Sequence, residues 1–271
     1  NYKKYFLLNN KTVLINGGLG LLGSEIARAS LSLGSNVIII DNDKLNKQKF
    51  LKTINKKYIQ NIQGIISDSS SITHINKIFK KFKQNKQIID VFINCSYPRD
   101  IFWSKNNYRN ISHKSLSKNI SLHTTSYIWF SKIVADYMFK NKTKGSIILL
   151  GSIYGVLAQN EKIYEGTNMS ENLTYNFVKG GLINFCRSMA AYYAKYSIRV
   201  NCLSPGAITG HVSGESLNQS KIFIDNYLRQ NPTKRLGEPR DVASACLFLS
   251  SDSSSYINGT NMIVDGGWTI V

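Results

Sequence analysis

The residues TVLINGGLGLLGSEIARASLSLG, at positions 12–34, decide the fold. An apolar run ends at Asn16, glycines follow at positions 17, 20 and 23, and a helical pattern begins at once. Glycines in this context permit a tight turn and let a pyrophosphate approach the backbone, while the first turn of the helix offers free N–H groups. The stretch therefore predicts a dinucleotide-binding loop, with a plain glycine-rich turn as the alternative. The loop residues expected to contact the cofactor are Gly17, Leu19, Gly20, Leu21 and Leu22.

Further apolar runs alternate with longer helical patterns along the chain. Continuous apolar runs predict strands buried on both faces, and intervening helices predict βαβ units. Right-handed crossovers then give an α/β fold of the Rossmann type, a doubly wound parallel sheet with helices on both faces. No repeat or linker interrupts the pattern, so residues 1–271 are expected to form a single domain. The expected strands are TVLIN (12–16), NVIIID (36–41), IQGIIS (62–67), DVFINC (90–95), SIILLGS (146–152), IRVNCLS (198–204) and NMIVD (261–265).

Polar side chains close the second, third and fourth of these strands. Asp41 follows the glycine loop by about 20 residues, where a carboxylate can bind the adenosine ribose and repel a 2′-phosphate, so NAD is favoured over NADP. Lys44 lies close enough to weaken that preference, and Asp41 could instead cap the next helix. Asp68 could bind the adenine edge or cap the helix that begins near Ser70. Asn94 ends the fourth strand, where a ligand crevice opens in such sheets.

A serine, a tyrosine and a lysine form the candidate catalytic group. Ser152 ends the fifth strand, and Tyr175 and Lys179 lie four residues apart on the next helix, so they share one face. A lysine ammonium beside a phenol is expected to lower the pKa of Tyr175 from about 10 toward neutrality. Tyr175 could then exchange a proton with a substrate hydroxyl or carbonyl, Ser152 could hydrogen-bond the same oxygen, and a nicotinamide would carry the hydride. A helix with a solvated face is the alternative.

Together, these motifs resemble the short-chain dehydrogenase/reductase family over nearly the whole chain. Further marks are RVNCLSPGAIT at 199–209 and RLGEPRDVASACLFLSSDSSSYINGTNMIVDGGW from Arg235 onward. The resemblance implies about seven strands in the order 3-2-1-4-5-6-7, an oxidoreductase that uses NAD or NADP, and a homotetramer or homodimer. It implies Tyr175 as general acid/base, Ser152 as the residue that orients the substrate, and Lys179 as the ligand of the nicotinamide ribose. The further cofactor contacts that it implies are Asn94, Cys95, Pro205, Gly206, Ile208 and Thr209.

The chain departs from the family pattern around the cofactor. The usual threonine before the glycine loop is Asn16, and the loop spacing is that of the extended branch of the family. The usual Asn-Asn-Ala-Gly after the fourth strand reads Asn94, Cys95, Ser96, Tyr97.

The fourth catalytic residue of the family is also in question. It is an asparagine in the helix before the fifth strand, and here Asn119 or, in another register, Ser121 holds its place. A serine would put the proton relay through water in doubt. His113 and His123 are expected to be ordinary helix residues, because nothing pairs them with carboxylates at metal-ligand spacing, and no metal site is predicted.

An insert at residues 153–174 separates the serine from the tyrosine and is longer than the family usually has. Loops over strand ends carry specificity, and Tyr154 and Tyr164 are the expected substrate contacts from this loop. Together with SYPRD at 96–100, the insert resembles sugar-modifying oxidoreductases of flagellin-glycan and sialic-acid-like surface-polysaccharide pathways. Arg99 could bind a substrate phosphate or form a surface salt bridge.

Charge and composition exclude several other classes. The formal net charge of +18 raises the possibility of a nucleic-acid partner, but the lysines lie on helix-like stretches without interleaved aromatic residues, so solvated helix faces are favoured. A basic field could still attract an anionic substrate. Four cysteines without CxxC pairing indicate a reducing cytoplasm. No apolar run reaches the ~18 residues of a membrane span, and no signal peptide is recognised.

The sequence therefore predicts a cytoplasmic NAD(P)-dependent oxidoreductase that interconverts a secondary alcohol and a ketone on a sugar, sugar phosphate or nucleotide sugar in glycan biosynthesis. A 3-oxoacyl-carrier-protein reductase is one alternative, favoured by the basic surface and disfavoured by Asp41 and the polar insert. A non-catalytic dinucleotide-binding or nucleic-acid-associated protein is the other, disfavoured by the intact Ser152, Tyr175 and Lys179.

Overall fold

A computed structural model describes residues 1–103, 106–210 and 219–271. At its centre lies a seven-stranded parallel sheet in the order β3-β2-β1-β4-β5-β6-β7, which confirms the predicted fold class and strand order. Every strand lies at a predicted apolar run, and the strand ends differ from the predicted ends by two residues at most. The strands are β1 (Thr12–Asn16), β2 (Asn36–Asp41), β3 (Ile62–Ile66), β4 (Val91–Asn94), β5 (Ser146–Leu150), β6 (Arg199–Pro205) and β7 (Asn261–Val264).

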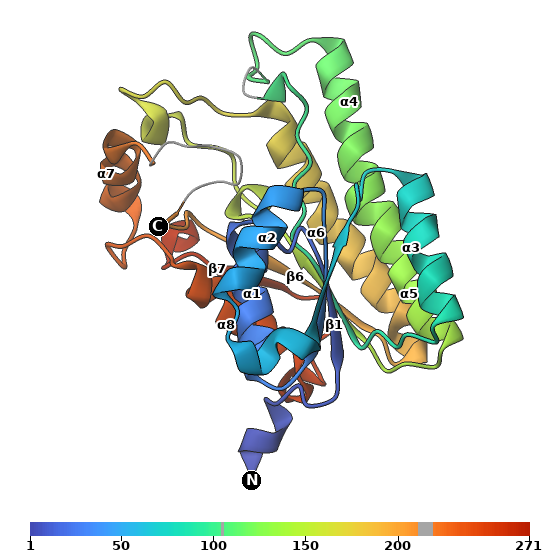
Figure 1. Ribbon diagram of the computed structural model, residues 1–271. Helices are drawn as coiled ribbons and strands as arrows, with labels where there is room; N and C mark the ends of the chain where they lie inside the picture. The colour runs from blue at the N-terminus through green and yellow to red at the C-terminus, as the bar shows by residue number, and fades with distance from the viewer. Residues whose placement is uncertain (104–105, 211–218) are drawn as a thin grey trace.

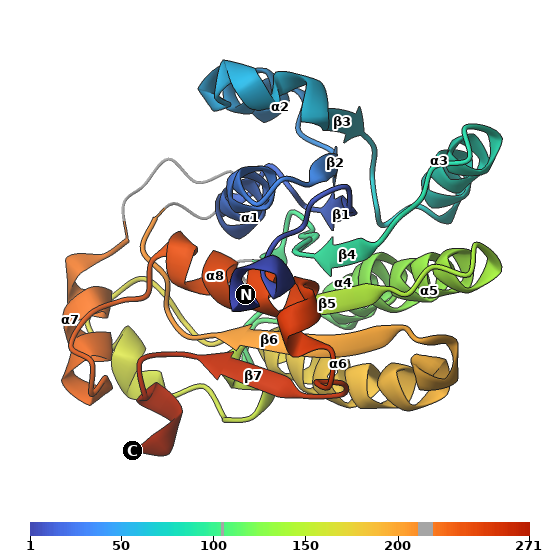
Figure 2. The ribbon, with the colours of Figure 1, turned by 90° about the horizontal axis from the view of Figure 1, so that it is seen from below.

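Helices cover both faces of this sheet (Figures 1 and 2). One face carries α1 (Leu21–Ser32), α2 (Lys44–Thr53) and α8 (Pro239–Ser250). The other carries α3 (Ile72–Gln84), α4 (His113–His123), α5 (Phe130–Lys140) and α6 (Leu173–Tyr193). The remaining helix, α7 (Lys221–Gln230), lies beyond the edge of the sheet and packs on the short helix η6 (Glu161–Tyr164).

Alternating strand residues build the two cores. Leu14 and Phe92 point to the face covered by α3, α5 and α6, while Val13 and Ile15 point to the face covered by α1 and α8. All of these side chains are fully buried, as expected for a parallel sheet between two helical layers. The carboxyl ends of the strands consequently meet along one edge, where parallel sheets of this kind bind ligands.

The helical segment before β5 is irregular. After α4 ends at His123, residues Thr124–Trp129 form a π-helical turn, η4, and α5 continues from Phe130. Such turns are rare and frequently occur at functional sites. Here the turn places the Ser126 carbonyl 2.8 Å from Nδ2 of Asn94, at the end of β4.

Short 3-10 helices complete the described part of the chain. They are η1 (Tyr2–Tyr5), η2 (Lys56–Asn61), η5 (Ile153–Gly155), η6, η7 (Ala194–Tyr196), η8 (Asp252–Ser254) and η9 (Trp268–Ile270). Among the described helices, none combines the length and apolar character needed to cross a bilayer.

Candidate active site

The glycine loop has the backbone geometry that a pyrophosphate site requires. Gly17 has a φ of +73°, and a Cβ there would lie 2.7 Å from the Ser96 backbone. A Cβ on Gly23 would collide with the Gly17 carbonyl, so both positions need glycine. Gly20 precedes α1 without a side-chain cap, which leaves the first N–H groups of the helix available to an anion. The loop therefore fits a dinucleotide, with Leu19, Leu21 and Leu22 beside it.

Asp41 organises this loop. Its Oδ2 accepts the Leu19 N–H at 2.9 Å, and its Oδ1 accepts the Asp43 N–H at 3.2 Å. Burial raises the pKa of the Asp41 carboxyl, against the lowering effect of these backbone hydrogen bonds. The N-cap of α2 is Asp43, whose side chain accepts the Asn46 N–H. Asp41 is therefore not the helix cap that the sequence left open.

Asp68 is also not a helix cap. Its Oδ1 accepts hydrogen bonds from the N–H and the hydroxyl of Ser70, at 2.8 Å and 2.7 Å. The cap of α3 is Ser71. Asp68 thus closes the turn after β3, at the same edge of the sheet as Asp41.

Asn94 ties together three chain segments below the predicted cofactor site. Its Oδ1 accepts hydrogen bonds from Nδ2 of Asn16 and from the hydroxyl of Ser96, while its Nδ2 donates to the Ser126 carbonyl. The side chain is fully buried, and these hydrogen bonds hold β4 against β1 and the π-helical turn η4. The neighbouring Cys95 thiol is neutral, because burial raises its pKa to about 12.

The predicted catalytic residues lie together. Ser152 follows β5, and its hydroxyl is near enough to that of Tyr175 to act against the rise in the pKa of the phenol. Tyr175 lies in the first turn of α6, where the Asn172 side chain caps the helix by accepting its N–H at 3.2 Å. One turn later Lys179 is 4% exposed, and its Nζ lies 5.7 Å from the centroid of the Tyr175 ring. The sequence placed all three at one edge of the sheet, and the structure has them there.

The expectation that Lys179 lowers the pKa of Tyr175 is wrong for this structure. Loss of water around the hydroxyl raises the pKa of Tyr175, and the neighbouring Ser152 side chain opposes that rise. The Lys179 ammonium donates to the Leu150 carbonyl at 2.7 Å and to the Tyr127 hydroxyl at 3.3 Å rather than to Tyr175. Burial lowers the pKa of Lys179 itself to about 8.

Two further tyrosines, missed from the sequence, surround Lys179. The centroids of the Tyr97 and Tyr127 rings lie 5.4 Å and 5.1 Å from its Nζ. The Tyr97 ring also lies 5.3 Å from the Tyr175 ring, and its hydroxyl accepts the Trp103 Nε1–H at 3.1 Å. A signal for Tyr97 was present, since it replaces the final glycine of the family's Asn-Asn-Ala-Gly.

Among the described residues, neither candidate for the fourth catalytic residue has a hydrogen bond with Ser152, Tyr175 or Lys179. Asn119 is buried, but its Nδ2 donates to the Ser115 carbonyl at 2.9 Å, and Ser121 is exposed. His123, one turn after Asn119, lies there instead, with its ring 4.7 Å from the Tyr97 ring. His123 is the last residue of α4 and is buried.

The predicted substrate contacts Tyr154 and Tyr164 lie on one side of Tyr175, and Arg99 lies further away. The Tyr154 ring lies 6.3 Å from the Tyr175 ring. Burial, followed by the nearby Tyr164 phenol, raises the pKa of Tyr154. Arg99 is one layer further out, because it stacks on Trp103 at 5.2 Å, and Trp103 in turn contacts Tyr97.

The insert connects two sides of the candidate site. Nδ2 of Asn172 donates to the Trp103 carbonyl at 3.1 Å, on the segment after β4. At the other side, the Tyr164 ring stacks on Phe223 of α7 with centroids 6.2 Å apart. The last two residues of the predicted insert, 173 and 174, belong to α6.

The segment after β6 runs along the same edge. The Gly206 N–H donates to the Val264 carbonyl, and the Thr209 N–H donates to the Gly237 carbonyl at 2.8 Å. Ile208 forms an isolated parallel bridge with Gly237. These contacts fix Pro205, Gly206, Ile208 and Thr209 beside the ends of β6 and β7.

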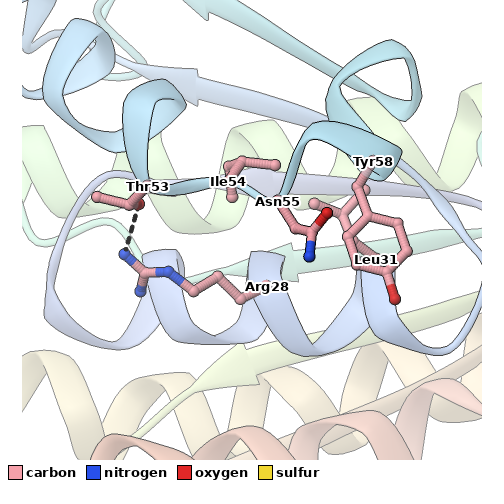
Figure 3. Close-up of a pocket in the computed structure, with 6 residues that line it drawn as sticks. All are labelled: Arg28, Leu31, Thr53, Ile54, Asn55 and Tyr58. Carbon is pink, nitrogen blue, oxygen red and sulfur yellow. Dashed lines mark hydrogen bonds between the residues drawn. The ribbon is translucent and has the colours of Figure 1, made fainter.

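A cavity of about 180 Å³ lies elsewhere, between α1 and the segment after α2 (Figure 3). Arg28 crosses it and donates to Oγ1 of Thr53 at 3.1 Å. Its lining residues are Arg28, Leu31, Thr53, Ile54, Asn55 and Tyr58, and none of them is a predicted site residue. Within the described ranges, no cluster of His, Cys, Asp and Glu could hold a metal ion.

Comparisons with known proteins found a matching family model and several similar chains. A family model described as enoyl-(acyl carrier protein) reductase matches residues 20–269. The post-translational flagellin modification protein A of Campylobacter coli is 30% identical and covers 97% of this chain and 99% of its own length. D-arabinitol 2-dehydrogenase (ribulose-forming) of Candida tropicalis is 29% identical, over 97% and 94%. The 3-oxoacyl-(acyl-carrier-protein) reductase FabG of Buchnera aphidicola is 33% identical, over 96% and 98%.

A solved structure is similar over almost the same span. A short chain dehydrogenase from Leptospira borgpetersenii, crystallised with bound NAD+, is 30% identical, with a TM-score of 0.84 over 99% of this chain and 96% of its own.

Proposed function

Because the chain belongs to the short-chain dehydrogenase/reductase family, we propose that this oxidoreductase interconverts a secondary alcohol and a ketone on a sugar, sugar phosphate or nucleotide sugar, with NAD as the preferred cofactor. The observation that carries the proposal is that the buried Lys179 has its Nζ 5.7 Å from the centroid of the Tyr175 ring, with the buried Ser152 nearby. Residues 1–271 then act as one NAD(P)-binding domain, and residues 153–174 act as its substrate loop.

The chain holds the cofactor at the start of α1 and at the end of β2 in this proposal, with further contacts at other residues. The free N–H groups at the start of α1, next to Leu21 and Leu22, bind the pyrophosphate. Asp41 binds the adenosine ribose, and its position at the end of β2 disfavours a 2′-phosphate. The other contacts that we assign to the cofactor are Gly17, Leu19, Gly20, Asp68, Asn94, Cys95, Tyr175, Lys179, Pro205, Gly206, Ile208 and Thr209. When bound, the nicotinamide supplies or accepts the hydride.

Proton transfer is assigned to Tyr175. Its raised pKa keeps the hydroxyl protonated at neutral pH, which suits donation of that proton to a carbonyl oxygen during reduction. Ser152 hydrogen-bonds the same oxygen and holds it near the phenol. Lys179 binds the nicotinamide ribose and keeps a positive charge beside the phenolate that forms.

The sugar substrate is favoured by the polar groups around Tyr175. Hydroxyls of Tyr154 and Tyr164 lie on the insert side, and Arg99 lies on the other side behind Trp103. The relative that acts on D-arabinitol shows that a similar chain accommodates a polyol. We assign Tyr154 and Tyr164 to substrate hydroxyls and Arg99 to a phosphate.

A 3-oxoacyl-carrier-protein reductase is the second candidate. The family model and one relative at 33% identity carry names that refer to the acyl carrier protein. A net charge of +18 would complement an acidic carrier protein.

Assembly and compartment follow the family expectation. We propose a cytoplasmic homotetramer or homodimer. The four cysteines are free, and three of them are buried, which suits a reducing compartment. Sedimentation velocity would measure the oligomeric state.

An absorbance assay of NADH and NADPH at 340 nm, on a panel of polyols, sugar phosphates, nucleotide sugars and acetoacetyl thioesters, tests the function. We expect turnover of a member of the sugar group with NAD. The variant Tyr175→Phe should lose turnover while it keeps NAD affinity, because only the proton-transferring hydroxyl is removed. Turnover of thioesters alone would select the second candidate, and full activity of Tyr175→Phe would refute the role given to Tyr175.

A further inference from the structure

The side chain of Asn172 joins the catalytic helix to the segment after β4. Its Oδ1 accepts the N–H groups of Thr174 and Tyr175, at 3.1 Å and 3.2 Å, in the first turn of α6. Its Nδ2 donates to the Trp103 carbonyl at 3.1 Å. Because a backbone N–H only donates and a carbonyl oxygen only accepts, this network fixes the orientation of the amide. One side chain therefore caps α6 and also reaches across to another part of the site.

The segment that Asn172 reaches comprises residues 96–103 and is called the wall segment below. It carries Tyr97 and Trp103, together with Arg99, which we assign to a substrate phosphate. Between β4 and α4, the described residues form no α-helix or strand. Long connections of this kind are usually functional, and without regular structure their position depends on contacts with the rest of the fold. The bond from Asn172 is one such contact.

The contacts of the wall segment form a closed circuit with Tyr175. Nε1 of Trp103 donates to the Tyr97 hydroxyl at 3.1 Å, and the two rings meet edge to face with centroids 5.9 Å apart. The Tyr97 ring in turn lies 5.3 Å from the Tyr175 ring. Since Asn172 bonds both the Trp103 carbonyl and the Tyr175 N–H, its amide closes the circuit. The amide thus holds the Tyr97 ring beside the phenol to which proton transfer is assigned.

Two backbone contacts of the same region support this arrangement. The Leu173 N–H donates to the Asn106 carbonyl at 2.9 Å, next to the bond between Asn172 and Trp103. From the insert, the Gln159 side chain accepts the Asn172 N–H at 2.7 Å. Asn172 is therefore bonded on one side to the wall segment and on the other to the insert, the two parts of the chain to which we assign substrate contacts.

We propose that Asn172 is a positioning residue: through its bond to the Trp103 carbonyl it holds the wall segment against Tyr175 and so fixes where the reacting carbon of the substrate lies. The proposal rests on the proposed function, in which Tyr175 transfers the proton and the wall segment contacts the substrate. A plain helix cap is the alternative. It needs only the Oδ1 atom of Asn172, whereas the proposal needs the Nδ2 atom as well.

Two variants of Asn172 separate the cap from the bond to the wall segment. Asn172→Ser and Asn172→Asp both keep an oxygen that caps α6, because serine, aspartate and asparagine are similarly good caps. Both lose the donor to the Trp103 carbonyl, and only the aspartate adds a charge. Ser71→Ala removes the side-chain cap of α3 and serves as the control for an ordinary loss of stability.

In both Asn172 variants we expect KM for the alcohol to rise about tenfold at saturating NAD, because one hydrogen bond that positions the substrate wall is lost. The value of kcat should stay near wild type, since Ser152, Tyr175 and Lys179 are unchanged. Thermal unfolding should match wild type, whereas Ser71→Ala should unfold at a lower temperature and keep the wild-type KM.

Two kinetic results would contradict the proposal. Folded Asn172 variants with the wild-type KM would make the residue a helix cap alone. A rise of KM in Asn172→Asp but not in Asn172→Ser would assign the effect to the added charge.

Amide hydrogen exchange gives a readout that needs no substrate. Peptides from the wall segment should exchange about fivefold faster in Asn172→Ser than in wild type, while peptides from α6 keep the wild-type rates. Wild-type exchange in the wall segment would refute the role given to Asn172. Absence of turnover on every alcohol would instead refute the proposed function, and the exchange rates would still decide whether Asn172 holds the wall segment.

Discussion

At the scale of single residues, the buried lysine governs how the site titrates. Lys179 is almost fully buried, and no ion pair among the described residues includes it. Its charge is stabilised by a carbonyl, a hydroxyl and aromatic ring faces rather than by a carboxylate. Such surroundings keep the ammonium only weakly stabilised, and its pKa falls from 10.5 to about 8.

This shift predicts a pH dependence of stability. Between pH about 8 and about 10.5 the unfolded chain keeps the Lys179 proton that the folded chain has released, so the free energy of unfolding rises with pH across that window. The rise should be about 3 kcal/mol in wild type and absent in Lys179→Met. Urea unfolding at both ends of the window measures it.

Lys118→Met, at an exposed position of α4, is the control and should show the wild-type rise. Subtracting the rise in the free energy of unfolding of Lys179→Met from that of Lys118→Met removes the contribution of the other groups that titrate in this pH window. An equal rise in Lys179→Met would mean that the lysine has its ordinary pKa in the folded protein.

At the scale of elements, the β1–α1–β2 unit links backbone shape to cofactor choice. The carboxylate of Asp41 both accepts the Leu19 N–H and lies where an adenosine ribose is expected. The Asp41 side chain therefore both shapes the loop and carries the charge that is expected to select the cofactor. Two substitutions can separate these two effects.

Asp41→Ala should weaken NAD binding by about tenfold and relax the exclusion of NADP, because both the hydrogen bond and the charge are lost. Asp41→Asn keeps an oxygen for the Leu19 N–H and removes only the charge, so it should retain more NAD affinity while admitting NADP. Fluorescence titration with both cofactors measures the four affinities. Unchanged affinities in both variants would show that Asp41 only shapes the turn.

The geometry of the glycine loop predicts that one added methyl group prevents cofactor binding. Gly17→Ala should abolish cofactor binding and destabilise the fold, because its Cβ would meet the Ser96 backbone and its φ is +73°. Gly181→Ala, on α6, is the matched change, since its Cβ would meet nothing within 4 Å. It should stabilise the protein by about 0.5–1 kcal/mol. Thermal unfolding compares the two, and equal effects would contradict the geometry assigned to the loop.

Some features of the fold and the site could be predicted from the sequence, and others could not. The strands and the glycine loop follow from local patterns, as does the shared face of Tyr175 and Lys179, because their periodicity is visible within a few residues. The surroundings of Lys179 are not local: Tyr127, which accepts its hydrogen bond, is 52 residues away in the chain. Burial of Tyr175 is likewise a tertiary property, and for that reason the expected fall in its pKa was wrong.

At the scale of the whole molecule, the excess of positive charge acts on substrate capture. Lysine and arginine number 34 against 16 acidic residues, so the protein carries a field that attracts anions. A neutral polyol would not respond to that field, whereas a sugar phosphate or an acidic carrier protein would. The dependence of kcat/KM on salt concentration can therefore distinguish charged substrates from neutral ones, which the geometry of the site alone does not distinguish.

If the substrate carries a phosphate, kcat/KM should fall several-fold as salt rises from about 50 mM to about 500 mM, because the screening length shrinks from more than 10 Å to only a few Å. Saturating NAD removes the contribution of cofactor capture, and the matching unphosphorylated sugar serves as the control substrate. The two substrates should converge at high salt, where only contacts such as the one assigned to Arg99 distinguish them. Arg99→Gln should therefore lower kcat/KM for the phosphate even at high salt and leave the neutral sugar unaffected. Equal effects on both sugars would assign Arg99 to its stacking on Trp103 instead.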